Sequence, residues 1–567
     1  MVADEVDGLG HGIYDEESDG ANRAEGSSAR AWWTNSRNGR IENGVIEERR
    51  NRFFPTERFL QACVRCPKKF GSRPRPVGQK NGPPPALPHE IQAPTGNVPP
   101  PSSQKCCRGT ARGDTDPARR TLMGVRNFFG VRDSVHLLVL GVILVAFGAG
   151  AGKVARHAPP SPFRPSGIAP AGQLAAKTDG APADGAQLQL TSGFVSKRKS
   201  VRTHAASLVE LGDGRIGAFW YAGTDEGTAD VTIQTAVFDP RLGHWSPERM
   251  VASRETTQRD LFRAVKKLGN PVASRAADGS LWLFYVTVSV GGWAGSSITT
   301  MTSHDDGETW SRPRRIVTSP FLNVSTLVKG PTFSYADGTL GLPVHAEFLG
   351  KFGELLRIDA AGSVIDKVRL SSGRSCLQPV VLIQDANRAL VLMRYAGATP
   401  PKRVMTTATG NAGQNWTPPV KSLLSNSNAA LTGLVLPDGR MLVALNDTEE
   451  RRETLSLVVS GDGGASWRTA YKVEDQSAAE TQGLDEVRYS AAIERLARAT
   501  NGVAADPDGY AKSVKQVMYS KQGYTFEYSY PSLIRTSRGD FHLVYTWNEA
   551  FIKHVQFSQA WLDRCLQ

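Results

Sequence analysis

The chain has 567 residues and a formal net charge of +12, a length that allows several domains or one large β domain with extensions. Residues 133–567 carry 46 basic and 40 acidic side chains, so the charge of this long C-terminal part is close to balanced and the short N-terminal tail carries as much positive excess. A nucleic-acid partner is therefore not expected for the C-terminal part.

Residues 1–122 are rich in Arg, Pro, Gly and Ser and show no sustained apolar period. Such a composition does not bury a core, so we predict a disordered, basic and Pro-rich extension. Met123 opens a segment typical of the start of an exported protein, and a mis-assigned start codon is an alternative explanation of this extension. Cys63 and Cys66 form a CxxC pair without a second pair or a histidine cluster, and we expect no metal and no cofactor.

Residues 134–152 form an uncharged, mostly apolar stretch that follows Arg126 and Arg132. The stretch is short for a spanning helix and also fits a signal sequence, and the preceding positive charges keep its N-terminal side in the cytoplasm. We therefore predict a signal anchor or transmembrane helix, with the C-terminal part membrane-anchored in the periplasm or the extracellular space. A buried core helix is the alternative. Residues 153–194, rich in Pro, Ala and Gly, are predicted to form a flexible linker.

From residue 195 to residue 562 the sequence changes to short β-type runs separated by turns. Six segments contain two apolar runs around a turn, as in SLVELGDGRIGAFWY, with turn centres near residues 213, 278, 337, 385, 438 and 538. Each segment predicts a hairpin, and a repeat of about 50 to 60 residues with two or more hairpins is typical of a β-propeller blade. The longest interval has an amphipathic helical pattern. It predicts a helical insertion at about 476–520, between the fifth and sixth blades, that shapes one rim of the site.

The stretch SHDDGETW, residues 303–310, is compatible with an acidic active-site loop, a calcium site or a turn. Similar stretches follow later strands: TGNAGQNW at 409–416 and SGDGGASW at 460–467. These segments resemble the Asp-box of the sialidase (neuraminidase) superfamily and of other BNR-repeat proteins. The resemblance implies an all-β, six-bladed β-propeller in which Asp305 forms a turn and Trp310 packs between blades. It also implies that the boxes lie on the rim opposite the catalytic face.

The resemblance further implies a set of catalytic residues. Sialidases bind the substrate carboxylate with three arginines, attack with a tyrosine that has a glutamate partner, and donate a proton from an aspartate. A tyrosine suits an acidic sugar because a carboxylate nucleophile would repel the substrate's carboxylate, which a guanidinium fork binds well. By position, Tyr530 takes the nucleophile role, and Arg394 and Arg452 match the second and third arginines. A core tyrosine and solvated strand-end arginines are the alternatives.

Two positions depart from the family pattern. The first-blade segment RTHAASL has His204 where the family has its first arginine, with Arg202 two residues earlier on the same strand face. Gln378 stands where the glutamate partner of the tyrosine is expected, and an amide cannot act as a base. Asn426 and Asn428, in the segment LLSNSNAAL, are further candidates for binding sugar hydroxyls.

Candidate proton carriers come from two segments. The loop AGTDEGTADV, where the family has its acid, offers Glu226 first and Asp230 second, and a solvated loop is the alternative. The segment LPVHAEF places His345 and Glu347 on one face of a third-blade strand. This pair either replaces the missing base or forms a structural hydrogen bond.

The sequence therefore favours an exported, membrane-tethered, sialidase-like exo-glycoside hydrolase that acts on terminal sialic acid or a related acidic sugar. Because the first arginine and the glutamate partner are altered, a related acidic sugar is a possible substrate beside sialic acid. A propeller that binds glycans or proteins without hydrolysis is the main alternative. A lyase that uses His345 or His204 as its base is a weaker one.

Overall fold

The structure is a computed structural model. It describes residues 131–155, 159–165, 190–199, 201–319, 323–500, 506–519 and 524–567. The extension predicted for residues 1–122 and most of the predicted linker lie outside the described residues.

Helix α1 (Val131–Ala155) contains the apolar stretch predicted to be a signal anchor or transmembrane helix. Within the described ranges, no helix is long and apolar enough to cross a membrane. The expectation of a membrane-spanning helix is therefore unsupported.

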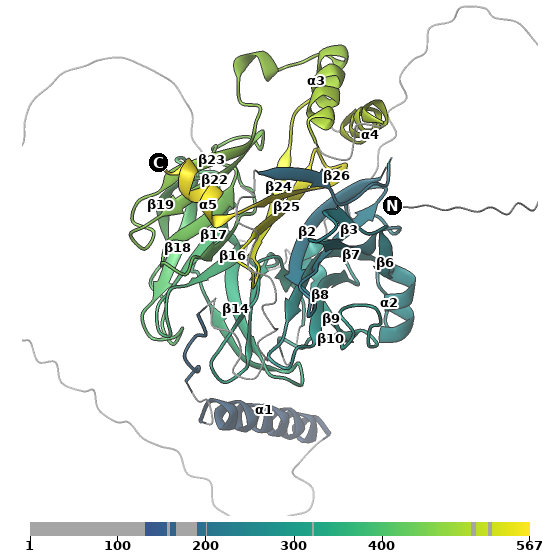
Figure 1. Ribbon diagram of the computed structural model, residues 1–567. Helices are drawn as coiled ribbons and strands as arrows, with labels where there is room; N and C mark the ends of the chain where they lie inside the picture. Colours follow the sequence, from purple (N-terminus) through teal and green to yellow (C-terminus); the bar gives the residue numbers. More distant parts are fainter. Residues whose placement is uncertain are drawn as a thin grey trace, which may run out of the picture. The chain divides into compact units, whose positions relative to one another are not determined.

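The strands of the described residues form six separate sheets, which are the blades of a β-propeller (Figure 1). Blade 1 contains β2 (Arg202–Glu210), β3 (Ile216–Gly223), β4 (Thr232–Asp239), β5 (His244–Trp245) and β6 (Arg249–Ala252). Blade 2 contains β7 (Lys267–Arg275), β8 (Leu281–Val288), β9 (Ser296–Ser303) and β10 (Arg314–Arg315). Blade 3 contains β11 (Leu327–Val328), β12 (Phe333–Ser334), β13 (Leu340–Ala346), β14 (Phe352–Ile358) and β15 (Val364–Arg369).

Each of the remaining three blades has four strands. Blade 4 contains β16 (Cys376–Ile383), β17 (Ala389–Tyr395), β18 (Arg403–Thr409) and β19 (Val420–Ser425). Blade 5 contains β20 (Thr432–Val435), β21 (Met441–Leu445), β22 (Thr454–Ser460) and β23 (Arg468–Asp475). Blade 6 contains β24 (Tyr528–Arg535), β25 (Phe541–Trp547), β26 (Phe551–Phe557) and β1 (Thr191–Phe194). Each of the six predicted hairpin turns joins two neighbouring strands within one blade, so the predicted propeller is confirmed.

The ring closes through β1, which comes from the start of the domain and pairs antiparallel with β26 of the last blade. Phe194 at the end of β1 is buried and packs on Trp547 and Phe551. The second strand of several blades reads as a continuous apolar run, as in LWLFYVTV of β8, in which every residue is buried. A strand has this composition when both of its faces are covered, here by the neighbouring blades.

The Asp-box at 303–310 is a turn. Asp305 accepts hydrogen bonds from the hydroxyl and the backbone N–H (2.9 Å) of Thr309, which lower the pKa of Asp305 to about 2. The ring of Trp310 meets Phe219 of blade 1 edge-on, with 5.8 Å between the centroids, so this tryptophan packs between blades as predicted. The box at 460–467 repeats the same hydrogen bonds around Asp462.

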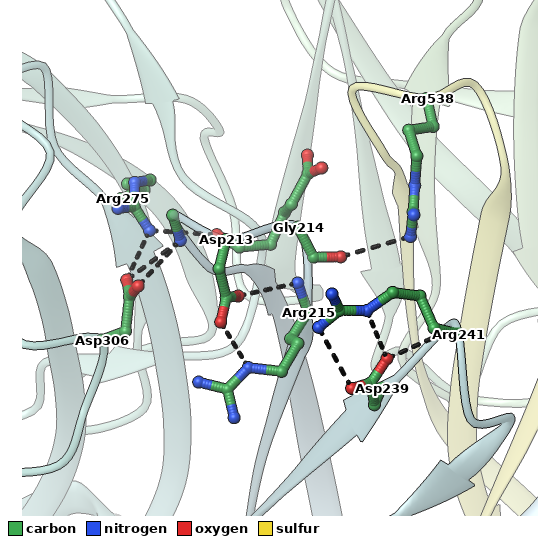
Figure 2. A network of polar contacts seen from close by, with 10 residues as sticks. Asp213, Gly214, Arg215, Asp239, Arg241, Arg275, Asp306 and Arg538 are labelled. Carbon is green, nitrogen blue, oxygen red and sulfur yellow. Dashed lines mark hydrogen bonds and ion pairs between the residues drawn. The ribbon is translucent and has the colours of Figure 1, made fainter. Parts of the chain in front are cut away.

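The next residue of the box, Asp306, connects blades 1 and 2 (Figure 2). Its carboxylate accepts hydrogen bonds from Arg275 at 2.9 Å and from the backbone N–H of Gly212 at 3.0 Å. Beside it, Asp213 binds Arg215, and the carbonyl of Gly214 accepts a bond from Arg538 of blade 6. Both aspartates of the octapeptide therefore stabilise the scaffold.

Helices occupy connections between strands, and one follows β26. They are α2 (Arg254–Leu261), η1 (Trp293–Gly295), η2 (Ala479–Thr481), α3 (Glu486–Arg498), α4 (Pro507–Tyr519) and α5 (Gln559–Cys565). Three of them, η2, α3 and α4, form the insertion between blades 5 and 6, where α3 and α4 contact each other (Figure 1). Asp485 caps the N-terminus of α3 by accepting a bond from the backbone N–H of Arg488.

One segment of the predicted linker is ordered against the propeller. Phe163 is buried, pairs with Tyr335 in a short β-bridge, and packs edge-on against Phe333 of blade 3. This contact was not predicted, because one phenylalanine among prolines has no periodic pattern.

Candidate functional site

Each blade has a strained backbone position at or next to the same end of its innermost strand. Among the described residues these positions are non-glycine residues with φ between 36° and 57°: Ala205, Asn270, Ser325, Gln378, Asn428 and Tyr530. In four blades the strand pairing also shifts at this position, as in a β-bulge. Left-handed conformations cost free energy in such residues, and bulges re-aim side chains, often at functional sites.

A pocket of about 470 Å³ lies among these positions. Its wall is mostly polar and contains His204, Glu226, Asn270, Trp293, Leu327, His345, Glu347, Lys351, Leu377, Gln378, Arg394, Arg452, Glu527, Tyr530 and Glu549. The pocket and the Asp-boxes lie at opposite ends of the strands. Strand β3 shows this, because the turn before it binds Asp306, whereas the loop after it carries Glu226 into the pocket.

Tyr530 is the centre of a hydrogen-bonded group in this pocket. Its phenol oxygen accepts bonds from Gln378 Nε2 and from Arg394 Nη1, each at 3.2 Å. Arg394 also donates to Gln378 Oε1 at 3.2 Å and to Asn428 Oδ1 at 2.8 Å. The imidazole of His204 stands 4.2 Å from the Tyr530 ring, between centroids. Predicted site residues from four blades thus meet around Tyr530.

Lys329 lies behind Tyr530 and was not predicted. Its ammonium group is 5.7 Å from the centroid of the Tyr530 ring and donates to the carbonyl of Pro531 at 3.2 Å. The residue is only 5% exposed, and burial lowers the pKa of Lys329 to about 8. Burial of this cation is unfavourable by itself, so its place next to Tyr530 calls for a functional reason.

Two further arginines are held by glutamates from blade 6 and its approach. Arg452 Nη1 is 2.9 Å from Glu527 Oε1, and Arg452 Nη2 donates to the carbonyl of Asn428 at 2.9 Å. Arg202 Nη1 is 2.8 Å from Glu549 Oε2. Arg452 and Glu549 line the pocket. Arg202 does not line it but is paired with Glu549. Paired guanidiniums are fixed in orientation and keep their charge.

Glu226 reaches the pocket from the β3–β4 loop. It hydrogen-bonds to Tyr221, whose pKa is raised well above its usual value by burial and by the charge of Glu226. Glu226 also interacts with Lys267, which stands 3.7 Å from the ring centroid of Trp293.

Asp230, the second acid predicted in this loop, accepts hydrogen bonds from other residues of the same loop. Burial tends to raise its pKa, but hydrogen bonds from Thr224 and Thr228 lower the pKa to about 2. It does not appear in the pocket wall described above.

His345 and Glu347 form the predicted pair. His345 Nε2 is 3.4 Å from Glu347 Oε1, and both residues line the pocket. Burial lowers the pKa of His345, and the hydrogen bond from His345 lowers the pKa of Glu347. The pair is therefore a neutral imidazole beside an ionised carboxylate at neutral pH. Arg394 interacts electrostatically with both, which links the pair to the Tyr530 group.

The sequence did not predict the partners that hold this site: Trp293, Lys329, Glu527 and Glu549. Glu527 lies three residues before Tyr530, and Trp293 directly follows a glycine pair, so both positions had a weak local signal. Glu549 had none. In the described part of the chain, no group of three or more His, Cys, Asp or Glu side chains could hold a metal ion.

The fold and the site together define a class of protein. It is a six-bladed Asp-box β-propeller with a polar pocket at one end of the strands, and a tyrosine and two arginines line this pocket. The BNR repeat-like domain family matches residues 214–543, which is more than half of the chain. The chain belongs to this family.

Several solved structures resemble the chain at low identity. A Hadza microbial sialidase, Hz136, is 15% identical, with coverage of 63% of this chain and 66% of that one and a TM-score of 0.46. A protein of unknown function from Dyadobacter fermentans is 12% identical, with coverage of 65% and 97% and a TM-score of 0.46. A mutant of NanB sialidase from Streptococcus pneumoniae is 10% identical, with coverage of 65% and 71% and a TM-score of 0.46. The chain spans just under two thirds of the first of these proteins. Among curated proteins, no match to the chain was found.

Proposed function

We propose that the protein is an exo-acting glycoside hydrolase that removes a terminal sialic acid or a related acidic sugar. The observation that carries this proposal is the Tyr530 phenol oxygen, which accepts hydrogen bonds from Arg394 and Gln378 inside the 470 Å³ pocket. A guanidinium at this place serves two purposes. It binds the carboxylate of the sugar, and it stabilises negative charge that develops on the phenol oxygen.

The proposed reaction has two displacements. In the first, Glu226 takes part in its protonated form. Tyr530 Oη attacks the anomeric carbon and gives its proton to Glu347, while the glycosidic bond breaks and the leaving oxygen takes the proton of Glu226. In the second, water attacks the same carbon and gives a proton to Glu226. The tyrosine–carbon bond breaks, and Tyr530 recovers its proton from Glu347. Two displacements retain the configuration of the sugar.

Glu347 is our choice as the base because Gln378 cannot accept a proton. Glu347 is ionised beside His345 and shares Arg394 with Tyr530. The described contacts include no direct bond between Glu347 and Tyr530, so the proton passes through water in this scheme. Replacing Glu347 with Gln should then slow the first displacement but leave the binding of the sugar intact.

The test is hydrolysis of fluorogenic glycosides of acidic sugars by the full chain. Wild-type protein should release the fluorophore, and Tyr530→Phe should abolish the release. Tyr528→Phe is the matched control, because the Tyr528 hydroxyl is buried in the same strand with no hydrogen-bond partner among the described residues. Full activity of Tyr530→Phe would refute the tyrosine mechanism.

A second candidate is a propeller that binds acidic glycans without hydrolysing them. Gln378 favours it, because its amide occupies the place of a base and makes the hydrogen bonds that hold Tyr530 and Arg394. Measurable binding of acidic glycans by calorimetry, with no turnover of any of them, would support this candidate over the first.

A further inference from the structure

One side of the pocket's surroundings is formed by connections of blades 2 and 3. It consists of residues 262–266, 289–295, 348–351 and 372–375, which we call the blade 2–3 rim. Each segment lies between two strands or directly before one, at the end of the strands where the pocket is. Trp293 and Lys351, from two of these segments, line the pocket itself.

The segments of this rim are held against one another. Arg263 Nε donates to Ser289 Oγ at 2.9 Å, which joins the first segment to the second. A Cβ atom at Gly350 would lie 3.3 Å from Arg374 Cγ, so the third segment is in contact with the fourth. Blades 2 and 3 also contact each other through β8 and β11. The rim is therefore one surface made of two neighbouring pairs of segments.

Large apolar side chains project from the rim into solvent. Phe262 is 91% exposed, Leu349 79%, Val290 77% and Phe348 57%. Phe262 also has a left-handed backbone, with a φ of 49°, at the C-terminal cap of α2. Glycine is favoured in this conformation, because a side chain there costs free energy. A bulky apolar residue that is both strained and exposed does not stabilise the fold, so it points to a partner.

The same rim is positively charged. Its exposed basic residues are Arg263, Lys266 and Arg374. Within the described ranges, none of these three cations takes part in an ion pair. The rim contains no Asp or Glu. Glu347, which directly precedes the third segment, is paired with His345 in the pocket wall.

Other loops at this end of the strands have the opposite character. The β3–β4 loop (224–231) contains three acidic residues and the β21–β22 loop (446–453) contains four. An anionic surface would therefore be attracted by the blade 2–3 rim and repelled by these loops. The apolar side chains of the rim are single projections from three loops. Single projections can enter a fluid layer of lipid headgroups one by one, whereas a folded partner would need a complementary surface for each.

We propose that the blade 2–3 rim docks onto a membrane surface that contains anionic lipids. In the docked protein the four exposed apolar side chains enter the boundary between headgroups and acyl chains, and the three cations bind anionic headgroups. The edge of the pocket that Trp293 and Lys351 line then lies beside the lipid surface. The proposal concerns binding alone, and it stands whether or not the pocket hydrolyses a glycan.

The first test follows the rim with an environment-sensitive fluorescent amino acid in place of Leu349. The full chain is mixed with vesicles of phosphatidylcholine, with or without phosphatidylserine. Emission should shift to the blue with the anionic vesicles, and added salt should weaken the shift because it screens the charges. The same amino acid in place of Leu242 is the control. Leu242 is 67% exposed in the β4–β5 turn, at the Asp-box end of the strands, so its emission should not change.

The second test measures the contribution of charge by titrating the Leu349 probe with anionic vesicles. The rim variant combines Arg263→Gln, Lys266→Gln and Arg374→Gln. The control variant combines Arg241→Gln, Arg388→Gln and Arg468→Gln, which removes three exposed cations near the Asp-box end. Both variants keep the same N-terminal region, so any contribution of α1 to vesicle binding is equal.

Each rim cation should contribute about fivefold to the affinity for anionic vesicles. The rim variant should therefore bind about 100-fold more weakly than the wild-type chain, and the control variant should differ by no more than about twofold. Three results would overturn the proposal: no shift of the Leu349 probe, an equal shift with neutral vesicles, or equal losses in the two variants. A shift that grows with protein concentration without lipid would also overturn it, because the rim would then bind a second copy of the chain.

Discussion

Replacing Lys329 with Met should make the propeller more stable. Methionine has almost the same length as lysine but carries no charge. In the folded protein Lys329 is buried behind Tyr530 with one hydrogen bond, to the carbonyl of Pro531. The side chain thus bears the cost of burying a cation, and the substitution removes that cost.

The magnitude follows from the pKa. Burial lowers the pKa of Lys329 from 10.5 to about 8, a difference that corresponds to about 3 kcal/mol of unfolding free energy. The lost hydrogen bond to Pro531 offsets about 1 kcal/mol of this gain. Lys329→Met should therefore raise the unfolding free energy by about 2 kcal/mol at pH 7.

The sign of the pH dependence is fixed by the direction of the shift. Because the folded-state pKa is the lower one, the cost is fully present below pH 8 and disappears as the pH rises towards 10.5. Above that range the wild-type lysine is neutral in both states, and the variant should be less stable than wild type by the lost hydrogen bond.

Urea unfolding of both proteins between pH 6 and pH 10.5 measures this difference. The control is Lys421→Met, since Lys421 also donates to a backbone carbonyl, that of Thr399, but is exposed. Its change should stay within about 0.5 kcal/mol. A Lys329→Met protein that is less stable than wild type at pH 7, or a difference that does not vary with pH, would refute the reasoning.

Three further predictions concern the site and the scaffold. Gln378→Glu should increase turnover of acidic glycosides, because it supplies a base at 3.2 Å from the Tyr530 oxygen and keeps the acceptor for Arg394; a loss of turnover would contradict the role given to Tyr530. Asp305→Ala should lower the melting temperature above pH 4, and the difference from wild type should shrink as the pH falls towards 2, the pKa to which the Thr309 bonds bring Asp305. Lys553→Met should destabilise the protein by about 3 kcal/mol, because it leaves Glu474 buried without its cation, and the double variant with Glu474→Gln should recover most of this loss in urea unfolding.

The scaffold could be predicted well because its signals are local. The hairpin turns and the Asp-boxes each lie within about ten residues, and the alternation of apolar runs and turns repeats along the chain. The boxes at 303–310 and 460–467 make the same internal hydrogen bonds in the structure. Such signals do not depend on which distant segments meet in space, so they can be recognised in the sequence without knowledge of the fold.

The contacts of the site were harder to predict because they join distant segments. Arg202 and Glu549 are 347 residues apart, and Gln378 and Tyr530 are 152 apart. Positions matched to the family named Tyr530, Arg394 and Gln378, and in the structure these three residues are hydrogen-bonded to one another. Lys329 and Glu549 match no motif, and only the closure of the ring places them beside their partners.

The ring of strained positions separates what the backbone of the scaffold fixes from what the side chains contribute. In each blade the left-handed residue at the end of the inner strand is fixed by the backbone, whatever its side chain. Gln378 is such a position, and exchange of a carboxylate for an amide there changes a base into a hydrogen-bond donor without loss of the bond to Tyr530. The backbone therefore fixes where Tyr530, Arg394 and residue 378 meet. In the proposed mechanism, the side chain at 378 decides whether the meeting point accepts a proton, and Glu347 accepts it because residue 378 is a glutamine.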